Sequence, residues 1–233
     1  MNLSKSLDFF NPGLVSEDVH IIGCGSVGSH EAVLLAKAGI GTNGKANIVL
    51  WDMDIVEEKN VANQAFTSVD VGKPKVEALR DILLAINPDL ENNIVLKPDG
   101  WQGEILSGYV FLAVDNIEIR KDIVNKNMSN VYVKGMFDVR TGLTDGQHFA
   151  ADWSDYKAKQ NFLRTMNFSH DEAEADVPRS ACGGILGVAS TVWIASSIAV
   201  NNFIKFVKGE GYVPAVAPFD GFAFYMNAAP IKK

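Results

Sequence analysis

HIIGCGSVGSHEAVLLAKAGIG (residues 20–41) carries three glycines, Gly23, Gly25 and Gly28, between an apolar run and a helical pattern. Glycine has no Cβ, so a Gly-x-Gly-x-x-Gly turn allows backbone N–H groups at a helix N-terminus to approach a phosphate, and the helix dipole favours the anion. Ser26 lies inside this turn. The stretch therefore predicts a strand, a phosphate-binding turn and a helix.

Apolar runs and helical patterns alternate along the rest of the chain. Strands are expected at 19–23, 46–51, 93–97, 109–114 and 131–137, and helices at 29–39, 73–88, 101–107 and 117–128. Joining strands through helices produces right-handed crossovers. The predicted fold class is α/β: a Rossmann-like, mostly parallel central sheet with helices on both faces, a long crossover loop and a buried C-terminal helix.

Length favours one domain of 233 residues,. We expect a nucleotide-binding half over about 15–130, an aperiodic crossover loop over about 153–182, and an apolar helix followed by one or two edge strands over 183–233. Residues 183–204 are uncharged and long enough to cross a bilayer, but their serines and asparagines favour a core helix over a membrane span.

Composition excludes several classes of partner. The net charge of -7 offers no basic surface, so no nucleic acid is expected as a partner,. With only Cys24 and Cys182, the chain lacks the paired CxxC of a structural zinc site, and no zinc is expected,. The N-terminal residues lack the apolar core of a signal peptide, which predicts a cytoplasmic protein.

Asp52 follows the second predicted strand, where a carboxylate can accept both ribose hydroxyls of a nucleotide. The turn and Asp52 fit NAD and ATP equally well. The segment after the strand, WDMDIVEEKNVANQAFTSVDVGKPKVEAL (51–79), brings carboxylates, amides and lysines to the turn. Lys75, in the first turn of its helix, can reach a phosphate. This composition suits a triphosphate that is held and cleaved, and we predict ATP.

Four ordered motifs resemble the ThiF/MoeB adenylyltransferase family, whose fold is shared with ubiquitin-activating enzymes. They are GCGSVGS, DMDIVEEKNVANQAF, DVGKPKVEAL and AVDNIEIRKDIVN, within about residues 19–209. The resemblance implies an enzyme that uses Mg-ATP to adenylate the C-terminal glycine carboxylate of a small ubiquitin-like or sulfur-carrier protein, or a peptide, with release of pyrophosphate. It also implies a homodimer.

The resemblance assigns roles to individual residues. Besides the glycines and Asp52, it implies that Asp54 orients its neighbours, that Asn60 and Gln64 face the triphosphate, that Lys75 contacts a phosphate and that Asp115 holds magnesium. Asn116 and Arg120 complete the family's D-N-x-x-x-R run. For these two, nucleotide contact and a structural role (a helix cap and an ion pair) stay open.

Two departures from the family pattern bear on catalysis. Asn63 stands where the family has an arginine, and the N-terminal helix that donates another arginine across the dimer is absent or shortened. Arg140, in FDVRTG, compensates in cis or forms a surface ion pair. Cys182 is a candidate for acyl transfer, its alternative being a small core residue.

The chain therefore has alternatives to an adenylyltransferase. One is a related binding subunit that has lost its chemistry, which Asn63 favours and the retention of Asp52, Lys75 and Asp115 opposes. Another is an ATP-dependent dehydratase of a modified tRNA base, which the acidic charge opposes. An NAD oxidoreductase is the last.

Overall fold

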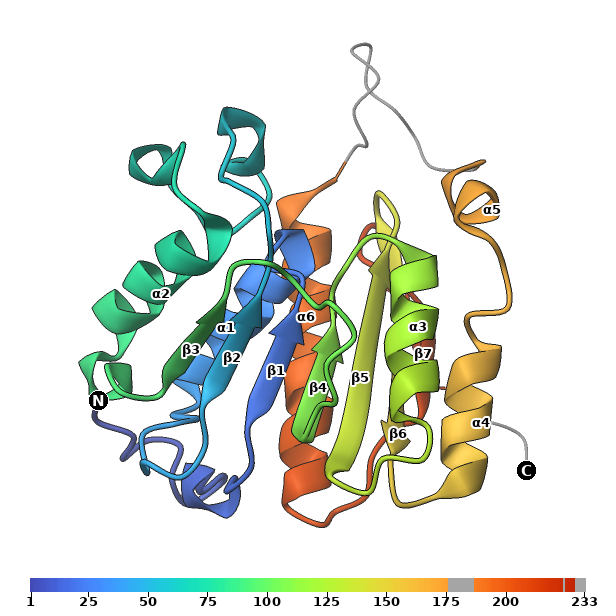
Figure 1. Ribbon diagram of the computed structural model, residues 1–233, viewed down its shortest axis with the longest axis horizontal. Helices are drawn as coiled ribbons and strands as arrows, with labels where there is room; N and C mark the ends of the chain where they lie inside the picture. Colours follow the sequence, from blue (N-terminus) through green and yellow to red (C-terminus); the bar gives the residue numbers. More distant parts are fainter. Residues whose placement is uncertain (176–186, 224, 229–233) are drawn as a thin grey trace.

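A computed structural model describes residues 1–175, 187–223 and 225–228 and contains one eight-stranded sheet (Figure 1). The strand order is β3-β2-β1-β4-β5-β6-β7-β8. The first five strands in this order, from β3 at the edge to β5, are parallel to one another. Strands β6, β7 and β8 extend the sheet by antiparallel pairing. Their bounds are β1 Val19–Ile22, β2 Ile48–Trp51, β3 Ile94–Lys97, β4 Gly108–Leu112, β5 Val133–Thr141, β6 Asp145–Asp152, β7 Ala215–Asp220 and β8 Tyr225–Ala228.

Helices cover both faces of the sheet, as residue alternation along the strands requires. The α-helices are α1 Ser26–Lys37, α2 Lys75–Ile86, α3 Ile117–Asn127, α4 Tyr156–Arg164, α5 His170–Ala175 and α6 Ala189–Val207. Short 3-10 turns are η1 Pro12–Leu14, η2 Glu58–Asn60, η3 Ser68–Asp70 and η4 Pro88–Leu90. One core packs α1, α2 and α6 against residues such as Ile21 and Phe111; the other packs α3 and α4 against residues such as Ile22 and Val110.

The register of β1 positions the functional edge. Ile22 pairs with Trp51 of β2 on one side and with Leu112 of β4 on the other. The three strands therefore end at one level. The connection that follows β1 leads to β2 on one side, and the connection that follows β3 leads to β4 on the other side. Such switch points bind ligands in open α/β sheets. The loops at this edge lie at the top of Figure 1.

The Rossmann-like fold, its parallel strands and the helices at 29–39, 73–88 and 117–128 are confirmed. The helix expected at 101–107 is wrong. Gly100 and Gly103 there have φ of 67° and 101°, a left-handed conformation that breaks a helix. The chain instead forms a loop that ends at β4.

The expected crossover loop is wrong in part. Its described portion contains α4 and α5, and Asp155 caps α4 by accepting hydrogen bonds from the N–H groups of Lys157 and Ala158. Strand β6 also escaped prediction. It forms a hairpin with β5, which continues through Arg140 to Thr141 beyond the last residue paired with β4.

Helix α6 packs on the sheet in the core that also holds α1 and α2, with Val192, Ala199 and Phe203 buried. Its interior position accounts for its apolar composition, since an enclosed helix is apolar around most of its circumference. Among the described residues, none of the helices has the combination of length and hydropathy that a bilayer crossing requires. Of the one or two edge strands expected in the C-terminal segment, the structure has β8 at the edge of the sheet and β7 between β6 and β8.

Candidate functional site

The three glycines of the turn meet different surroundings. A Cβ on Gly23, whose φ is +94°, would lie 2.7 Å from the backbone of Ala113 and Val114, the loop after β4. A Cβ on Gly28 would lie 1.9 Å from the carbonyl oxygen of Gly23. A Cβ on Gly25 would meet nothing within 4 Å. Gly23 and Gly28 thus permit close packing, while the space over Gly25 at the start of α1 is open to a ligand.

This difference predicts different outcomes for two alanine substitutions. Gly28→Ala should lower the free energy of unfolding by about 1–3 kcal/mol or more, because a clash with backbone cannot be relieved by a rotamer change. Gly25→Ala should cost less, because a Cβ at this position would meet nothing within 4 Å. Urea denaturation of both variants checks this, and equal losses would contradict the assignment of a packing role to Gly28 alone.

Asp52 is joined to the glycine turn. Its Oδ2 accepts a hydrogen bond of 2.6 Å from the N–H of Cys24, and its Oδ1 accepts one of 2.8 Å from the N–H of Asp54. Partial burial raises the pKa of the carboxyl, and the charge of Lys75 opposes that rise. The carboxylate is thus fixed beside the turn at the end of β2, as expected for a group that accepts ribose hydroxyls.

Lys75 is the first residue of α2 and is largely buried. Its Nζ donates a 2.8 Å hydrogen bond to Asp54 Oδ2, and its N–H donates one of 2.9 Å to the Asp54 carbonyl. Side chain and backbone together therefore hold the start of α2 against the end of β2. The carboxylate of Asp54 is 62% exposed, so the lysine charge lies just below the surface of this edge.

The polar segment between β2 and α2 covers the first turns of α1. Ser29 Oγ of α1 accepts a hydrogen bond of 3.0 Å from the N–H of Ala65. Asn60 is buried, and its Oδ1 accepts the N–H of Glu57 at 2.8 Å in a capping box around η2. Gln64 presents a buried Oε1 without a hydrogen-bond partner among the described residues. The expected contact of this amide with the triphosphate stays a prediction.

Asn63 lies beside the chain that enters α6. A Cβ on Gly187 would come within 2.7 Å of its Nδ2. The side chain is half-buried. Where the resembled family places an arginine charge, this chain therefore has a neutral amide next to Gly187.

Asp115 follows β4 by three residues and comes just before α3. Its side chain is exposed, and it makes no hydrogen bond or ion pair to another residue within 1–175, 187–223 and 225–228. Because Gly23 packs on Ala113 and Val114, the loop that carries Asp115 abuts the glycine turn. A free carboxylate beside a phosphate site fits Mg²⁺, which takes one or two carboxylates together with phosphate oxygens and water.

Asn116 and Arg120 have the structural contacts that the sequence left open. Asn116 is the N-cap of α3, and its Oδ1 accepts from the N–H groups of Glu118 and Ile119. Arg120 is buried; its Nε donates to the Val114 carbonyl at 2.7 Å, and Nη1 forms an ion pair with Asp138. Both side chains thus stabilise the loop around Asp115.

Arg140 differs from the expectation that it neutralises phosphate charge. Its Nε and Nη2 donate to Asp138 Oδ2 at 2.9 and 2.5 Å, and its Nη1 donates to the carbonyl oxygen of Thr165 at 2.6 Å. The guanidinium also lies over the ring of Phe149, with its carbon 4.5 Å from the ring centroid. All three nitrogens are occupied within the fold, so Arg140 is neither a free cation nor a surface ion pair.

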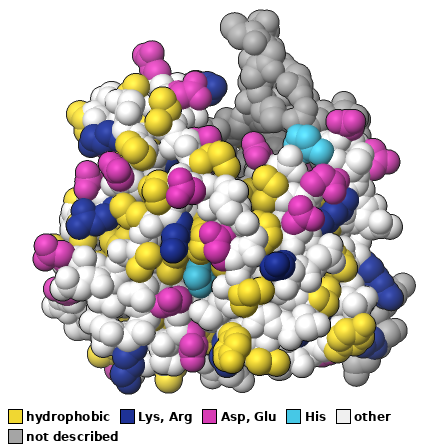
Figure 2. Space-filling model, in the orientation of Figure 1, with side chains coloured by type: hydrophobic (Ala, Val, Ile, Leu, Met, Phe, Trp, Pro, Cys, Tyr) yellow, Lys and Arg dark blue, Asp and Glu magenta, His cyan; other side chains and the backbone are white. Residues whose placement is uncertain are grey.

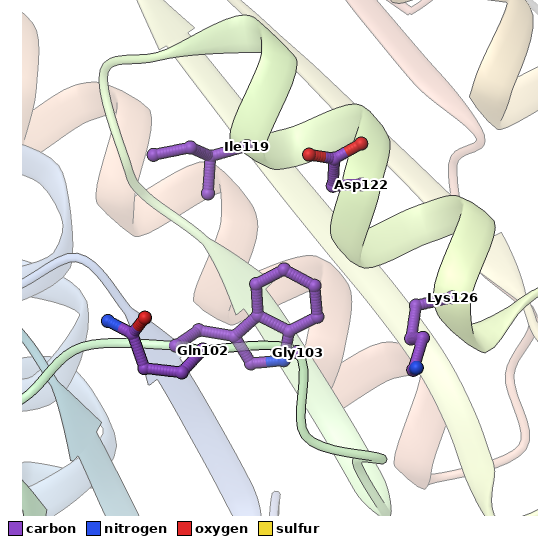
Figure 3. A pocket seen from close by; sticks show the side chains of 6 residues that line it. Gln102, Gly103, Ile119, Asp122 and Lys126 are labelled. Carbon is purple, nitrogen blue, oxygen red and sulfur yellow. The ribbon is translucent and has the colours of Figure 1, made fainter.

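An open groove of about 500 Å³ runs between the loop after β3 and the exposed face of α3 (Figure 3). It is lined by Trp101, Gln102, Gly103, Ile119, Asp122 and Lys126. The Trp101 Nε1–H donates to the Glu104 carbonyl at 2.9 Å, which orients the indole. The sequence analysis missed this groove because it read the loop as a helix; a tryptophan between Gly100 and Gly103 was the available signal.

The structure describes one of the two cysteines. Cys24 is buried in the glycine turn, and burial raises the pKa of its thiol. Cys182 lies outside the described residues, so its predicted thioester chemistry stays a prediction. The expectation of no zinc also stays a prediction: within residues 1–175, 187–223 and 225–228, no three His, Cys, Asp or Glu side chains gather as metal ligands.

The face shown in Figure 2 mixes charges of both signs. Lysines and arginines lie scattered among aspartates and glutamates without forming a continuous basic area. Nucleic-acid binding depends on contiguous cationic groups along phosphates. This face therefore carries no track of that kind.

The glycine turn, Asp52, Lys75 and the loop that carries Asp115 lie at the switch point of a Rossmann-like sheet, which defines the class of the protein as Rossmann-like α/β. The sequence profile described as "ThiF family" matches residues 13–233, and the chain belongs to this family. It is similar to the sulfur carrier protein ThiS adenylyltransferase of Escherichia coli K12, with 33% identity over 213 residues that cover 84% of this chain and 77% of that protein.

Other relatives match over shorter parts. A probable adenylyltransferase/sulfurtransferase MoeZ of Mycobacterium tuberculosis is 41% identical over 71 residues, 30% of this chain and only 17% of MoeZ. Among solved structures, Escherichia coli MccB with ATP aligns with a TM-score of 0.68 and 17% identity over 95% of this chain and 66% of MccB. The likeness to MccB shows a shared fold.

Proposed function

We propose that the protein is an ATP-dependent adenylyltransferase that activates the C-terminal carboxylate of a small ubiquitin-like or sulfur-carrier protein, or of a peptide. The observation that carries the proposal is the junction of three loops: Gly23 packs on the backbone that leads to Asp115, and Asp52 accepts from Cys24 in the same turn. Open space over Gly25, a ribose acceptor, a buried lysine and a free carboxylate thus belong to one site.

The reaction joins a carboxylate oxygen to the α-phosphorus of ATP and breaks the bond from that phosphorus to the β-phosphate bridging oxygen. The products are an acyl adenylate and pyrophosphate. Because two anions meet and the nucleophile is already ionised, the site needs positive charge and hydrogen-bond donors more than a general base. The α1 amides and Lys75 supply these, and Asp115 would hold Mg²⁺, whose charge offsets that of the phosphates.

The groove beside Trp101 suits the adenine base. Asp52 is the proposed ribose acceptor at the end of β2, and a Cβ on Gly100, in the loop that precedes Trp101, would lie 3.3 Å from Cε of the next residue, Met53. The groove therefore begins on the side of the ribose site formed by this loop. An indole and the Ile119 side chain provide apolar surfaces for a flat base, as most ligand pockets do.

The nature of the second substrate is supported by the relatives. One is named for the sulfur carrier ThiS, another is an ubiquitin-like modifier-activating enzyme 5 of Caenorhabditis briggsae, and one MccB structure contains a MccA variant. These names support a protein or peptide as the second substrate, and the proposed reaction requires that it has a free C-terminal carboxylate. We further propose a cytoplasmic homodimer.

Nucleotide choice tests the proposal. Calorimetry should show binding of Mg-ATP in preference to NAD, and Asp52→Ala should weaken ATP about tenfold to a hundredfold, the scale of a lost hydrogen bond to a charged group. Asp81→Ala, which removes an exposed carboxylate from α2, is the matched control and should not change affinity. Tight NAD binding without ATP binding would refute adenylation.

A scaffold without chemistry is the competing proposal, and specific contacts favour it. Asn63 is neutral, and Arg140 is bonded to Asp138 and Thr165, so two expected cations do not serve the phosphates. ATP–pyrophosphate exchange distinguishes the two. A scaffold would bind its partner and show no exchange, whereas the adenylyltransferase would exchange label only with a partner that has a free C-terminus.

A further inference from the structure

Asp138 is the last residue of β5 that pairs with β4, and its side chain is fully buried between two arginines. Oδ1 pairs with Arg120 and Oδ2 with Arg140. A buried carboxylate requires this compensation, because removing its charge from water costs several kcal/mol. The two cations, however, also make further contacts, and these lead to different parts of the chain.

Arg120 contacts the loop that carries Asp115. Its Nε donates to the carbonyl oxygen of Val114 at 2.7 Å, one residue before Asp115. Its Nη1 also donates to the Val139 carbonyl at 2.9 Å. The guanidinium thus fixes the backbone of the loop that carries Asp115 against β5.

Arg140 contacts the segment between α4 and α5. Two hydrogen bonds join it to Thr165, one to the carbonyl oxygen at 2.6 Å and one to Oγ1 at 2.9 Å. The ring of Phe168 also lies against the guanidinium, 5.4 Å from centroid to carbon. A separate tether runs from α3, where Lys121 Nζ donates to the Phe168 carbonyl at 2.6 Å.

We infer that Asp138 is a positioning residue that, through Arg120 and Arg140, links the Asp115 loop to the segment Thr165–Phe168. The inference rests on the proposed function, since Mg-ATP binding at Asp115 is what the link transmits. A ligand that restrains the Asp115 loop restrains Arg120, then Asp138, Arg140 and the backbone of Thr165. Coupling of two sites in this way is reciprocal and is measurable as a change in local opening.

Hydrogen exchange with Mg²⁺ and α,β-methylene-ATP tests the link. In the wild type, the analogue should slow exchange in residues 113–121 and also in 161–169. Arg140→Lys keeps the charge beside Asp138 but has no fork to span Asp138 and Thr165. The variant should keep the nucleotide-induced protection at 113–121. At 161–169 its nucleotide-induced protection factor should be about fivefold or more lower than that of the wild type, which is the lower end of the range for coupling between two sites.

Arg164→Lys is the matched control, because this neighbouring arginine contacts only Asn161 in the described chain; it should behave as wild type. If Arg140→Lys does not fold, Thr165→Ala, which removes one of the two bonds, should reduce the same protection. Loss in Lys121→Gln with none in Arg140→Lys would overturn the inference, as would protection confined to 113–121 in the wild type. Absence of analogue binding would instead refute the proposed function.

Discussion

Asp115→Asn is expected to cut ATP–pyrophosphate exchange about a hundredfold to a thousandfold, which is a loss of about 3–4 kcal/mol of transition-state stabilisation. The physical reason is that the amide is neutral and a poor Mg²⁺ ligand, so charge is no longer offset as the acceptor carboxylate meets the α-phosphate. ATP affinity should largely remain, because the contacts at Asp52 and the glycine turn do not involve Asp115.

Calorimetry of ATP binding tests the role of Asp115 without the second substrate. In EDTA, wild type and Asp115→Asn should bind ATP alike in calorimetry, and the gain on adding Mg²⁺ should shrink only in the variant. Glu118→Gln neutralises an exposed carboxylate three residues away, bonded to Lys121, and controls for general surface charge. Equal exchange by wild type and Asp115→Asn would remove Asp115 from the mechanism.

Glu31→Gln should abolish a fall in stability between pH 6.5 and 8. Glu31 lies in α1, almost completely buried, and its Oε2 has no hydrogen-bond partner among the described residues. Burial raises its pKa to about 8, although the charge of Arg120 acts in the opposite direction. A carboxyl whose pKa is raised by folding stabilises the protein below the unfolded pKa of about 4.5, and this contribution is lost as pH rises towards 8.

The pH window separates Glu31 from the buried histidines. Burial lowers the pKa of His20 and His148 to about 4, so their effect on stability falls below pH 6.5, where the unfolded rings become protonated. From pH 6.5 to 8, wild type should lose about 2 kcal/mol of unfolding free energy, at 1.36 kcal/mol per pKa unit. Urea titrations check this. Glu91→Gln, at an exposed site, should keep the wild-type slope, and the same slope in Glu31→Gln would refute the prediction.

Local motifs were the most predictable part of the site. Gly23, Gly28 and Asp52 act within one βαβ unit, where strand pairing brings the end of β2 beside the turn, so spacing alone indicated their positions. Lys75 was predictable for the same reason, since the start of α2 is held to the end of β2 by Asp54. The parallel sheet followed from the alternation of strands and helices.

Contacts between distant segments were not predictable from the pattern. Arg140 bonds Thr165, 25 residues away, in a part of the chain whose helices the sequence analysis missed. Arg120 gave no signal of its partner, because Asp138 lies on strand β5, outside helix α3, and an arginine four residues after an N-cap also suits a solvated helix face. Trp101 was obscured by an apolar loop that resembled a short helix.

Strand β5 extends beyond the end of β4, and its last residues can therefore vary in sequence and length without changing the parallel strands. Asp138 pairs with Leu112, the last residue of β4, and Val139 to Thr141 continue against β6 alone. The end of this hairpin therefore projects beyond the parallel strands. The length of its turn, at residues 142–144, sets how far it projects. Insertions at such a tip are tolerated more readily than changes in a core strand. Lengthening this turn would change that end of the hairpin while the pairing of β1, β2 and β4 stays in register.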